Sequence, residues 1–240
     1  MNKNINTAIV KDMSAETAPI SSMRKTSLVA GLLYLLTFVS IPTLSLYGSI
    51  HEPDYIIGAG TDTAVTIGGL LEIIVALAGI GTAITLYPVL KKQNESLALG
   101  LVASRILEAG TMFAGVAFLL SVVSLRQSGA GADALVTSHA LVALYDRIFL
   151  LGQSFIPALN DLLLGILLYQ SRLVPRALSL VGIIGAIPLL AGFILMLFGV
   201  IEKISLFAGL SALLVAAFEF SLGIYLVVKG FKSSTLIARL

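Results

Sequence analysis

Long apolar stretches separated by short polar segments dominate the chain. Six windows each hold about 20 or more mostly apolar residues, which is the length that an α-helix needs to cross the hydrocarbon core of a bilayer. The pattern predicts an all-α fold, a polytopic transmembrane helical bundle of six spans, in a domain covering residues 26–230. Residues 1–25 are expected to be a disordered tail and residues 231–240 a second tail. The six windows are residues 27–48, 64–90, 96–124, 148–170, 177–199 and 204–228.

Composition supports the membrane assignment and excludes several kinds of chemistry. Hydrophobic residues make up 58% of the chain and charged residues 12%, against about 25% charged residues in a typical soluble domain. The chain has no Cys and two His, which excludes disulfides, thiolate catalysis and Cys-ligated metals. We therefore expect no cofactor and no resident metal. The net charge of +2 gives no indication of nucleic-acid binding.

The distribution of Lys and Arg predicts the orientation in the membrane. Eleven of the 15 basic residues fall in the N-terminal tail, the 91–95 and 171–176 loops and the C-terminal tail, which a six-span topology places on one side. Three others lie in the opposite loops, and Arg105 falls inside a span. Because basic residues concentrate on the cytoplasmic side, both termini are expected to be cytoplasmic.

The apolar pattern allows two interpretations of residues 126–147. We expect a short interfacial helix over residues 132–147, because its fusion with the fourth span would exceed the ~30 Å of a bilayer core. A long fourth helix that projects outward is the alternative. Pro42, Pro157 and Pro188 lie within spans and mark possible kinks.

Ionisable side chains inside the spans are the candidate functional residues. At 1.5 Å per residue from the basic flanks, Arg105, Asp161 and Glu219 lie at similar depths of ~15–20 Å. Glu108 lies three positions after Arg105, on the same helix face. Charged groups facing lipid are costly, so these side chains should converge on the bundle interior. The candidate ion, proton or ligand site comprises Arg105, Glu108, Asn160, Asp161, Glu219 and, nearer the opposite boundary, Glu72.

The charge balance of this set indicates either titration or binding. Four carboxylates against one guanidinium leave a charge of −3 if all of them are ionised. Either some of the acids are protonated, or a cation or a small cationic solute occupies the site. A purely structural role stays open, since Arg105 and Glu108 could form an internal ion pair. Matching depths also do not establish contact. For Glu72, a structural or partly exposed position is the favoured interpretation.

Several sequence blocks resemble a family of bacterial six-span membrane proteins that is described only as a domain of unknown function. They include "LYPVLKKQNESLALG", "SRILEAG", "SRLVPRALSLVGIIGAIPLL" and "AAFEFSLGIYLVVKGF". The resemblance covers roughly residues 25–232. It implies a multi-pass protein of the bacterial plasma membrane and carries no established activity, partner or ligand. The family's Arg-x-x-Glu corresponds to Arg105 and Glu108, its last-span Glu to Glu219, and its "LVPR" loop to Pro175 and Arg176. The outer loops, including residues 126–147, match poorly.

The sequence is compatible with three functions. The first is a small-solute transporter or channel coupled to a proton or a cation through the buried acids. The second is a non-catalytic sensor, assembly factor or accessory protein whose buried acids are structural. The third is a lipid-modifying enzyme, which the absence of a nucleophile motif such as G-x-S-x-G makes the weakest. An enzyme is therefore not expected. The lipid bilayer is the expected partner of the chain, and a homo-oligomer is compatible with the sequence.

Overall fold

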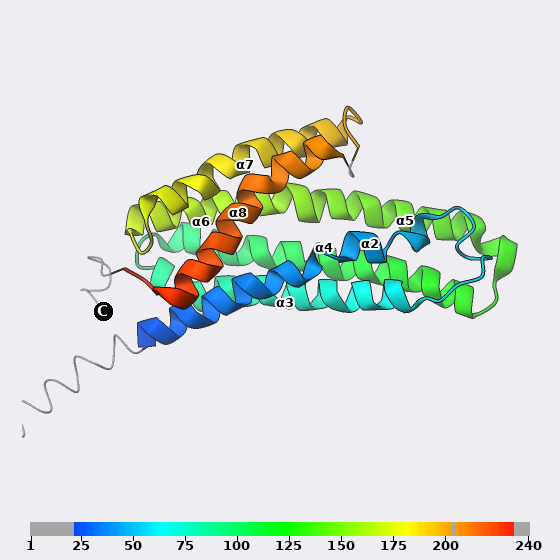
Figure 1. The fold of residues 1–240 in the computed structure, drawn as a ribbon, viewed down its shortest axis with the longest axis horizontal. Helices are drawn as coiled ribbons and strands as arrows, with labels where there is room; N and C mark the ends of the chain where they lie inside the picture. Colours follow the sequence, from blue (N-terminus) through cyan, green and yellow to red (C-terminus); the bar gives the residue numbers. More distant parts are fainter. Residues whose placement is uncertain (1–21, 203–204, 233–240) are drawn as a thin grey trace, which may run out of the picture.

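Helices form all the regular structure in the part of the chain that the computed structural model describes, residues 22–202 and 205–232. The predicted all-α class is confirmed there. Residues 22–37, which include the last four of the predicted tail, form the first helix. The rest of both predicted tails, apart from residues 231–232, lies outside the described residues. The elements that follow are η1 (Phe38–Ser40), α2 (Thr43–Leu46), η2 (Ser49–His51), α3 (Thr63–Leu90), α4 (Glu95–Gln127), η3 (Gly131–Ala134), α5 (Leu135–Leu150), η4 (Leu151–Phe155), α6 (Ile156–Ser171), α7 (Arg176–Leu197) and α8 (Leu206–Val228) (Figure 1).

Five helical stretches in the described ranges are long and apolar enough to cross a membrane. They correspond to the last five predicted spans, so the prediction of a membrane protein built from several apolar helices holds. The first predicted span, residues 27–48, is not one continuous helix. The five stretches are Thr63–Leu90, Glu95–Gln127, Gly131–Ser171, Arg176–Leu197 and Leu206–Val228.

The first apolar segment breaks at residues 41–42, where a turn separates η1 from α2. Pro42 has no backbone N–H and its ring clashes with the preceding helical turn, which explains the position of the break. Neighbouring hydroxyls occupy carbonyls around it: Thr37 donates to the Tyr34 carbonyl at 2.7 Å, and Thr43 to the Ser40 carbonyl at 2.6 Å. Such side-chain bonds help to satisfy backbone groups that a broken helix would leave without partners.

The prediction of a separate interfacial helix over residues 132–147 is wrong. Residues 131–171 form one uninterrupted helical stretch of 41 residues, which at 1.5 Å per residue is ~60 Å long. Its middle is a π-helical turn, η4, which ends two residues before Pro157. Pro157 therefore does mark an irregularity. Pro188, in contrast, lies inside α7 without ending it.

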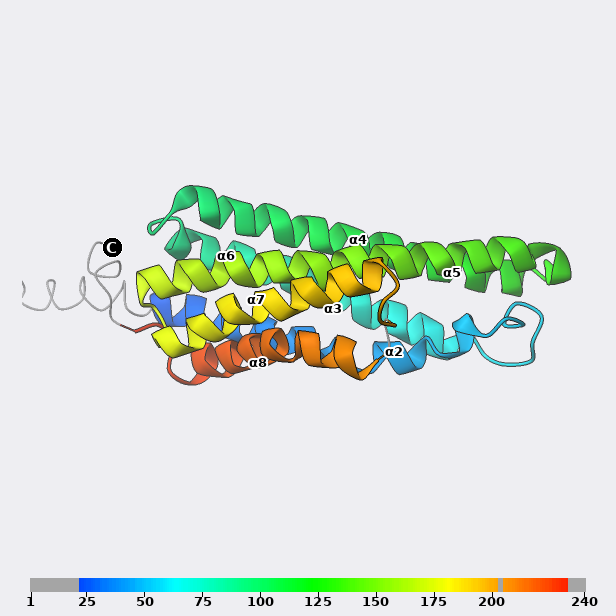
Figure 2. The ribbon, with the colours of Figure 1, turned by 90° about the horizontal axis from the view of Figure 1, so that it is seen from above.

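The helices form a bundle whose two halves differ in thickness. The first described helix begins and α8 ends at the same end of the bundle, and α7 and α8 cover only the half nearest that end (Figures 1 and 2). Because α3, α4 and the α5–α6 helix are longer, they extend beyond α7 and α8 at the opposite end. The candidate residues lie on the helices between two apolar clusters, one near each end.

Small residues let the helices approach closely. A Cβ atom on Gly31 would lie 2.7 Å from the Gly223 carbonyl oxygen, and one on Gly182 would lie 2.7 Å from the Phe218 ring. Gly192 is similarly pressed against Ser211. Close packing through small residues is common where lipid supplies no hydrophobic driving force between helices, and here it draws α8 against its neighbours.

Candidate functional site

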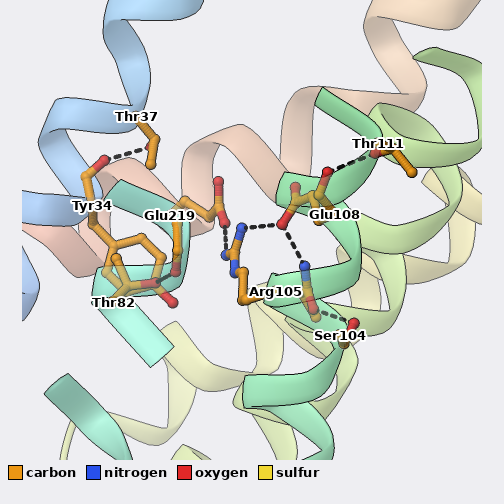
Figure 3. A network of polar contacts seen from close by, with 10 residues as sticks. Tyr34, Thr37, Thr82, Ser104, Arg105, Glu108, Thr111 and Glu219 are labelled. Atoms are coloured by element: carbon orange, nitrogen blue, oxygen red, sulfur yellow. Dashed lines mark hydrogen bonds and ion pairs between the residues drawn. The ribbon is translucent and has the colours of Figure 1, made fainter. Parts of the chain in front are cut away.

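Arg105 lies at the centre of a buried polar network that joins three helices (Figure 3). Its Nη1 atom donates to Glu108 Oε2 at 2.9 Å on the same helix, α4, and its Nη2 atom donates to Glu219 Oε1 at 2.5 Å on α8. Asn160 on α6 donates from Nδ2 to Glu108 Oε2 at 2.8 Å. The side chains of Arg105, Glu108 and Glu219 are 5%, 8% and 16% exposed, so water screens these pairs little.

Local helix geometry explains how these residues meet. Positions 105 and 108 lie on one face of α4 because residues three apart are neighbours on a helix surface. Ser104, the residue before Arg105 on the same helix, donates to Asn160 Oδ1 at 2.5 Å, which fixes the orientation of the amide. The ring of Tyr34, from the first described helix, lies 5.8 Å from the Arg105 guanidinium. A cation–π contact of this kind adds to the stabilisation of a desolvated Arg.

Asp161 lies beside this network but outside its hydrogen bonds. The residue is fully buried, and among the described residues neither carboxyl oxygen has a hydrogen-bond partner. It is close enough to Glu219, Arg105 and Glu108 for their charges to interact. A buried ionised carboxylate without hydrogen bonds is very unfavourable. The neutral acid or a bound cation would remove that cost.

Glu72 belongs to a second cluster nearer the opposite end of the bundle. It is 1% exposed, which excludes a partly exposed position and leaves a structural role as the other interpretation favoured for it from the sequence. Its Oε1 atom accepts hydrogen bonds from Tyr145 Oη and Gln153 Nε2, both at 3.2 Å. The ring of Tyr47 packs edge-on against Tyr145, with the centroids 5.4 Å apart. The candidate set therefore divides into a group around Arg105 and a separate group around Glu72.

A cavity of about 260 Å³ lies against the Arg105 group. Arg105, Glu108 and Glu219 contribute its charged lining, and Gln153 contributes an amide that also bonds Glu72. The break in the first apolar segment lines the same cavity through residues 37, 38, 40 and 41. Most of the remaining lining is apolar. It comes from Val75, Ala76, Gly79, Ala109, Met112, Pro157, Leu189, Ala212, Val215 and Ala216.

Neutral residues that were not among the candidates from the sequence connect the site. Gln153 links the Glu72 cluster to the cavity, and Ser104 and Tyr34 hold the Arg105 network from two sides. Gln153 carried a usable signal, because a lone amide eight positions before Asp161 is unusual in an apolar helix. Tyr34 also carried one, since aromatic hydroxyl residues favour membrane boundaries and this one lies well inside the span.

Within residues 22–202 and 205–232, no cluster of three or more His, Asp or Glu side chains has the arrangement of a metal site. The described carboxylates of the Arg105 group instead face a guanidinium and an amide. This arrangement suits the exchange of a proton or the binding of a cationic group better than the closed coordination of a resident metal.

The fold and the buried polar site define a helical protein of the membrane. Comparison with known protein families matches residues 29–230 to Domain of unknown function (DUF4386). The chain belongs to this family, as the resemblance of its sequence blocks indicated. No curated protein and no solved structure matches the chain.

Proposed function

We propose that this chain is a six-span protein of the bacterial plasma membrane that moves a small solute across the bilayer, coupled to a proton or a cation. One observation carries the proposal. The cavity meets both the Arg105–Glu108–Glu219 network and the break in the first apolar segment. Inside a membrane, charged side chains and irregular backbone each raise the free energy of the folded protein. Here both line the same cavity.

The broken segment supports transport more than a purely structural role. Irregular backbone inside a membrane is tolerated where it lines a cavity or is buried in protein, and discontinuous helices form the binding sites of many secondary transporters. The segment packs against α3 on both sides of the break. A Cβ atom on Gly81 would lie 3.0 Å from Leu33, and one on Gly68 would lie 2.5 Å from Tyr47. We therefore count it as the sixth span, interrupted at the cavity.

A topology of six spans with cytoplasmic termini predicts which side of the membrane each loop faces. Lys91, between α3 and α4, would face the cytoplasm, and Glu202, between α7 and α8, would face the outside. Because the chain has no Cys, Lys91→Cys and Glu202→Cys can each be labelled in spheroplasts with an impermeant maleimide. Labelling of Glu202→Cys alone is expected, and labelling of both from outside would contradict the topology.

The charges around the cavity support coupling to a proton or a cation. Glu108, Glu219 and Asp161 carry three negative charges when ionised, against the single positive charge of Arg105. Glu108 has two donors, Arg105 and Asn160, whereas Asp161 has none among the described side chains. Asp161 is therefore the group whose charge most needs a proton or a bound cation. Glu219, with an exposed fraction of 16%, is the carboxylate best placed to exchange with the cavity.

Proton movement in proteoliposomes tests the proposal without knowledge of the solute. Vesicles holding a pH-sensitive dye and a valinomycin-imposed potential, negative inside, should acidify faster with the protein than without it. Asp161→Asn and Glu219→Gln should reduce the protein-dependent rate at least tenfold. Glu52→Gln, at an exposed position away from the cavity, is the matched control and should keep it. A wild-type rate equal to that of protein-free vesicles would contradict coupling to a proton. Unchanged rates in both cavity variants would contradict a coupling role for Asp161 and Glu219.

The second candidate is a non-catalytic sensor, assembly or accessory protein. It is favoured by the internal pairing of Ser104, Asn160, Glu108 and Arg105, a chain in which each member bonds the next. Such a chain can fix helix register without exchanging anything with solvent. In that case Glu219→Gln would lower stability while leaving proton movement unchanged.

A further inference from the structure

The loop between α6 and α7 forms a basic hollow at the end of the bundle where the described chain begins and ends. Leu173 and Val174 are 0% and 1% exposed and anchor the loop in the core. The backbone N–H of Lys232 donates to the Leu173 carbonyl at 2.8 Å, which ties the segment after α8 to the loop. Arg172, Arg176 and Lys232 thereby surround one hollow of about 390 Å³, with Val174 as its apolar wall.

The backbone of Arg172 is in a left-handed conformation, which is strained for any residue other than glycine. Its φ is 57°, and it is the one residue other than glycine with a positive φ in the described ranges. Residues with a Cβ atom are strained in this left-handed conformation, and helices commonly place glycine where they end in this way. Here an arginine occupies the end of α6, so a cation projects beside the hollow where glycine would relieve the strain.

Arg176 is also in an unfavourable position unless an anion is nearby. It is the first residue of α7, and a helix N-terminus carries a partial positive charge that repels cations. Its guanidinium lies 5.0 Å from the centroid of the Tyr169 ring, which holds it beside the hollow. In the described part of the chain, no carboxylate forms an ion pair with Arg172, Arg176 or Lys232.

We propose that this hollow binds the phosphate of an anionic lipid headgroup. Three cations without acidic partners and the N-terminus of α7 converge there, and phosphate satisfies both. Leu180 and Ile184 follow Arg176 at four-residue intervals on one face of α7 and are 39% and 53% exposed, which offers a path for an acyl chain. That apolar path favours a lipid over free phosphate. The proposal is independent of any transport by the central cavity.

Lipid binding by the purified full chain tests the proposal. Native mass spectrometry with phosphatidylglycerol and phosphatidylcholine should show at least a fivefold preference for the anionic lipid. Arg176→Gln and Lys232→Gln should each weaken phosphatidylglycerol binding about fivefold, since each removes one of the cations that line the hollow and a basic residue beside an anionic headgroup contributes roughly that factor. Lys91→Gln removes an exposed cation from the loop between α3 and α4 and should leave the binding unchanged.

Arg172→Gly tests the lipid site with a substitution that should not impair folding. Glycine suits the left-handed backbone, so this variant should match or exceed the wild-type unfolding temperature while it loses phosphatidylglycerol binding about fivefold. Unchanged binding in Arg172→Gly and Arg176→Gln would overturn the proposal, as would an equal loss in Lys91→Gln. Inorganic phosphate should not displace phosphatidylglycerol at millimolar concentration. Displacement would overturn the assignment to a lipid and indicate a soluble phosphate compound instead.

Discussion

Arg105 on α4 donates a hydrogen bond to Glu219 on α8 across 114 positions of the sequence, with 2.5 Å between Nη2 and Oε1. The same guanidinium holds Glu108 on its own helix. One cation thus compensates two carboxylates from different helices, at the point where both line the central cavity. The contact ties α8 to α4 beside the cavity.

Arg105→Gln should strongly destabilise the protein. Removal of one partner from a buried ion pair leaves charges without compensation and typically costs about 3–5 kcal/mol. We expect a large fall in the unfolding temperature in detergent. The double variant Arg105→Gln, Glu219→Gln should recover part of it, because one of the stranded carboxylates is then neutral. A double variant less stable than either single variant would show that the ion pair is not what holds the two helices.

Gly182→Ala should also destabilise the bundle, through packing alone. A Cβ atom at this position would lie 2.7 Å from the buried Phe218 ring, and overpacking of this kind costs about 1–3 kcal/mol. Gly110→Ala is the matched control, because nothing lies within 4 Å of its added Cβ atom. There alanine should be neutral or stabilising, by up to ~1 kcal/mol, since it favours helix. Equal unfolding temperatures for the two variants would contradict the packing argument.

Asp62, at the start of α3, should make stability depend on pH in the acid range. Burial alone would raise the pKa of this carboxyl, but hydrogen bonds from Tyr55 and Gln127 and the charge of Arg126 lower it below its usual value. A depressed pKa contributes stability that is complete above the unfolded value of about 3.9 and is lost as the pH falls through the folded pKa.

Asp62→Asn should therefore lower stability by about 1–2 kcal/mol at pH 7, the scale of hydrogen bonds to charged groups. The difference in unfolding temperature between variant and wild type should stay constant from pH 8 to pH 5 and shrink below pH 4. Tyr55→Phe, which removes one of the donors, should show a smaller difference with the same pH dependence. A difference that grows as the pH falls would contradict this sign.

Hydropathy and charge predicted the fold class and the levels of the buried charges. Depth measured along each helix put Arg105, Asp161 and Glu219 at one level, and Arg105 and Glu219 are in contact in the structure. Depth along a helix does not tell which way a side chain faces, because it leaves the rotation of the helix about its own axis undetermined. Glu72 therefore proved to bond Tyr145 and Gln153 rather than to be partly exposed.

Backbone irregularities were harder to predict than spans. Pro42 suggested a kink, and the structure has a turn at residues 41–42. The hydroxyls of Thr37 and Thr43, which bond backbone carbonyls on either side of it, gave no signal in hydropathy. The helix of residues 131–171 is continuous although it is longer than a bilayer core is thick. Its first half, α5, packs on α4, so the thickness of the bilayer did not decide where this helix begins. The π-helical turn, which contains Gln153, has no signature in hydropathy.

Thiol accessibility in the naturally Cys-free chain tests most directly whether the cavity exchanges with water. Ala216 lines the cavity. Ala217, the next residue, is exposed on the outer surface of α8 and does not line the cavity, and Ala83 is buried in the apolar core. Each is replaced by Cys, and the rate of reaction with a small cationic methanethiosulfonate is measured from each side of the membrane at pH 6 and pH 8. Rates are divided by that of the exposed Glu52→Cys variant, which corrects for the ionisation of the thiol itself. Our account predicts that Ala216→Cys reacts at least tenfold faster than Ala83→Cys and Ala217→Cys, with a preferred side of access that changes with pH. An Ala216→Cys variant as unreactive as Ala83→Cys from both sides at both pH values would contradict it.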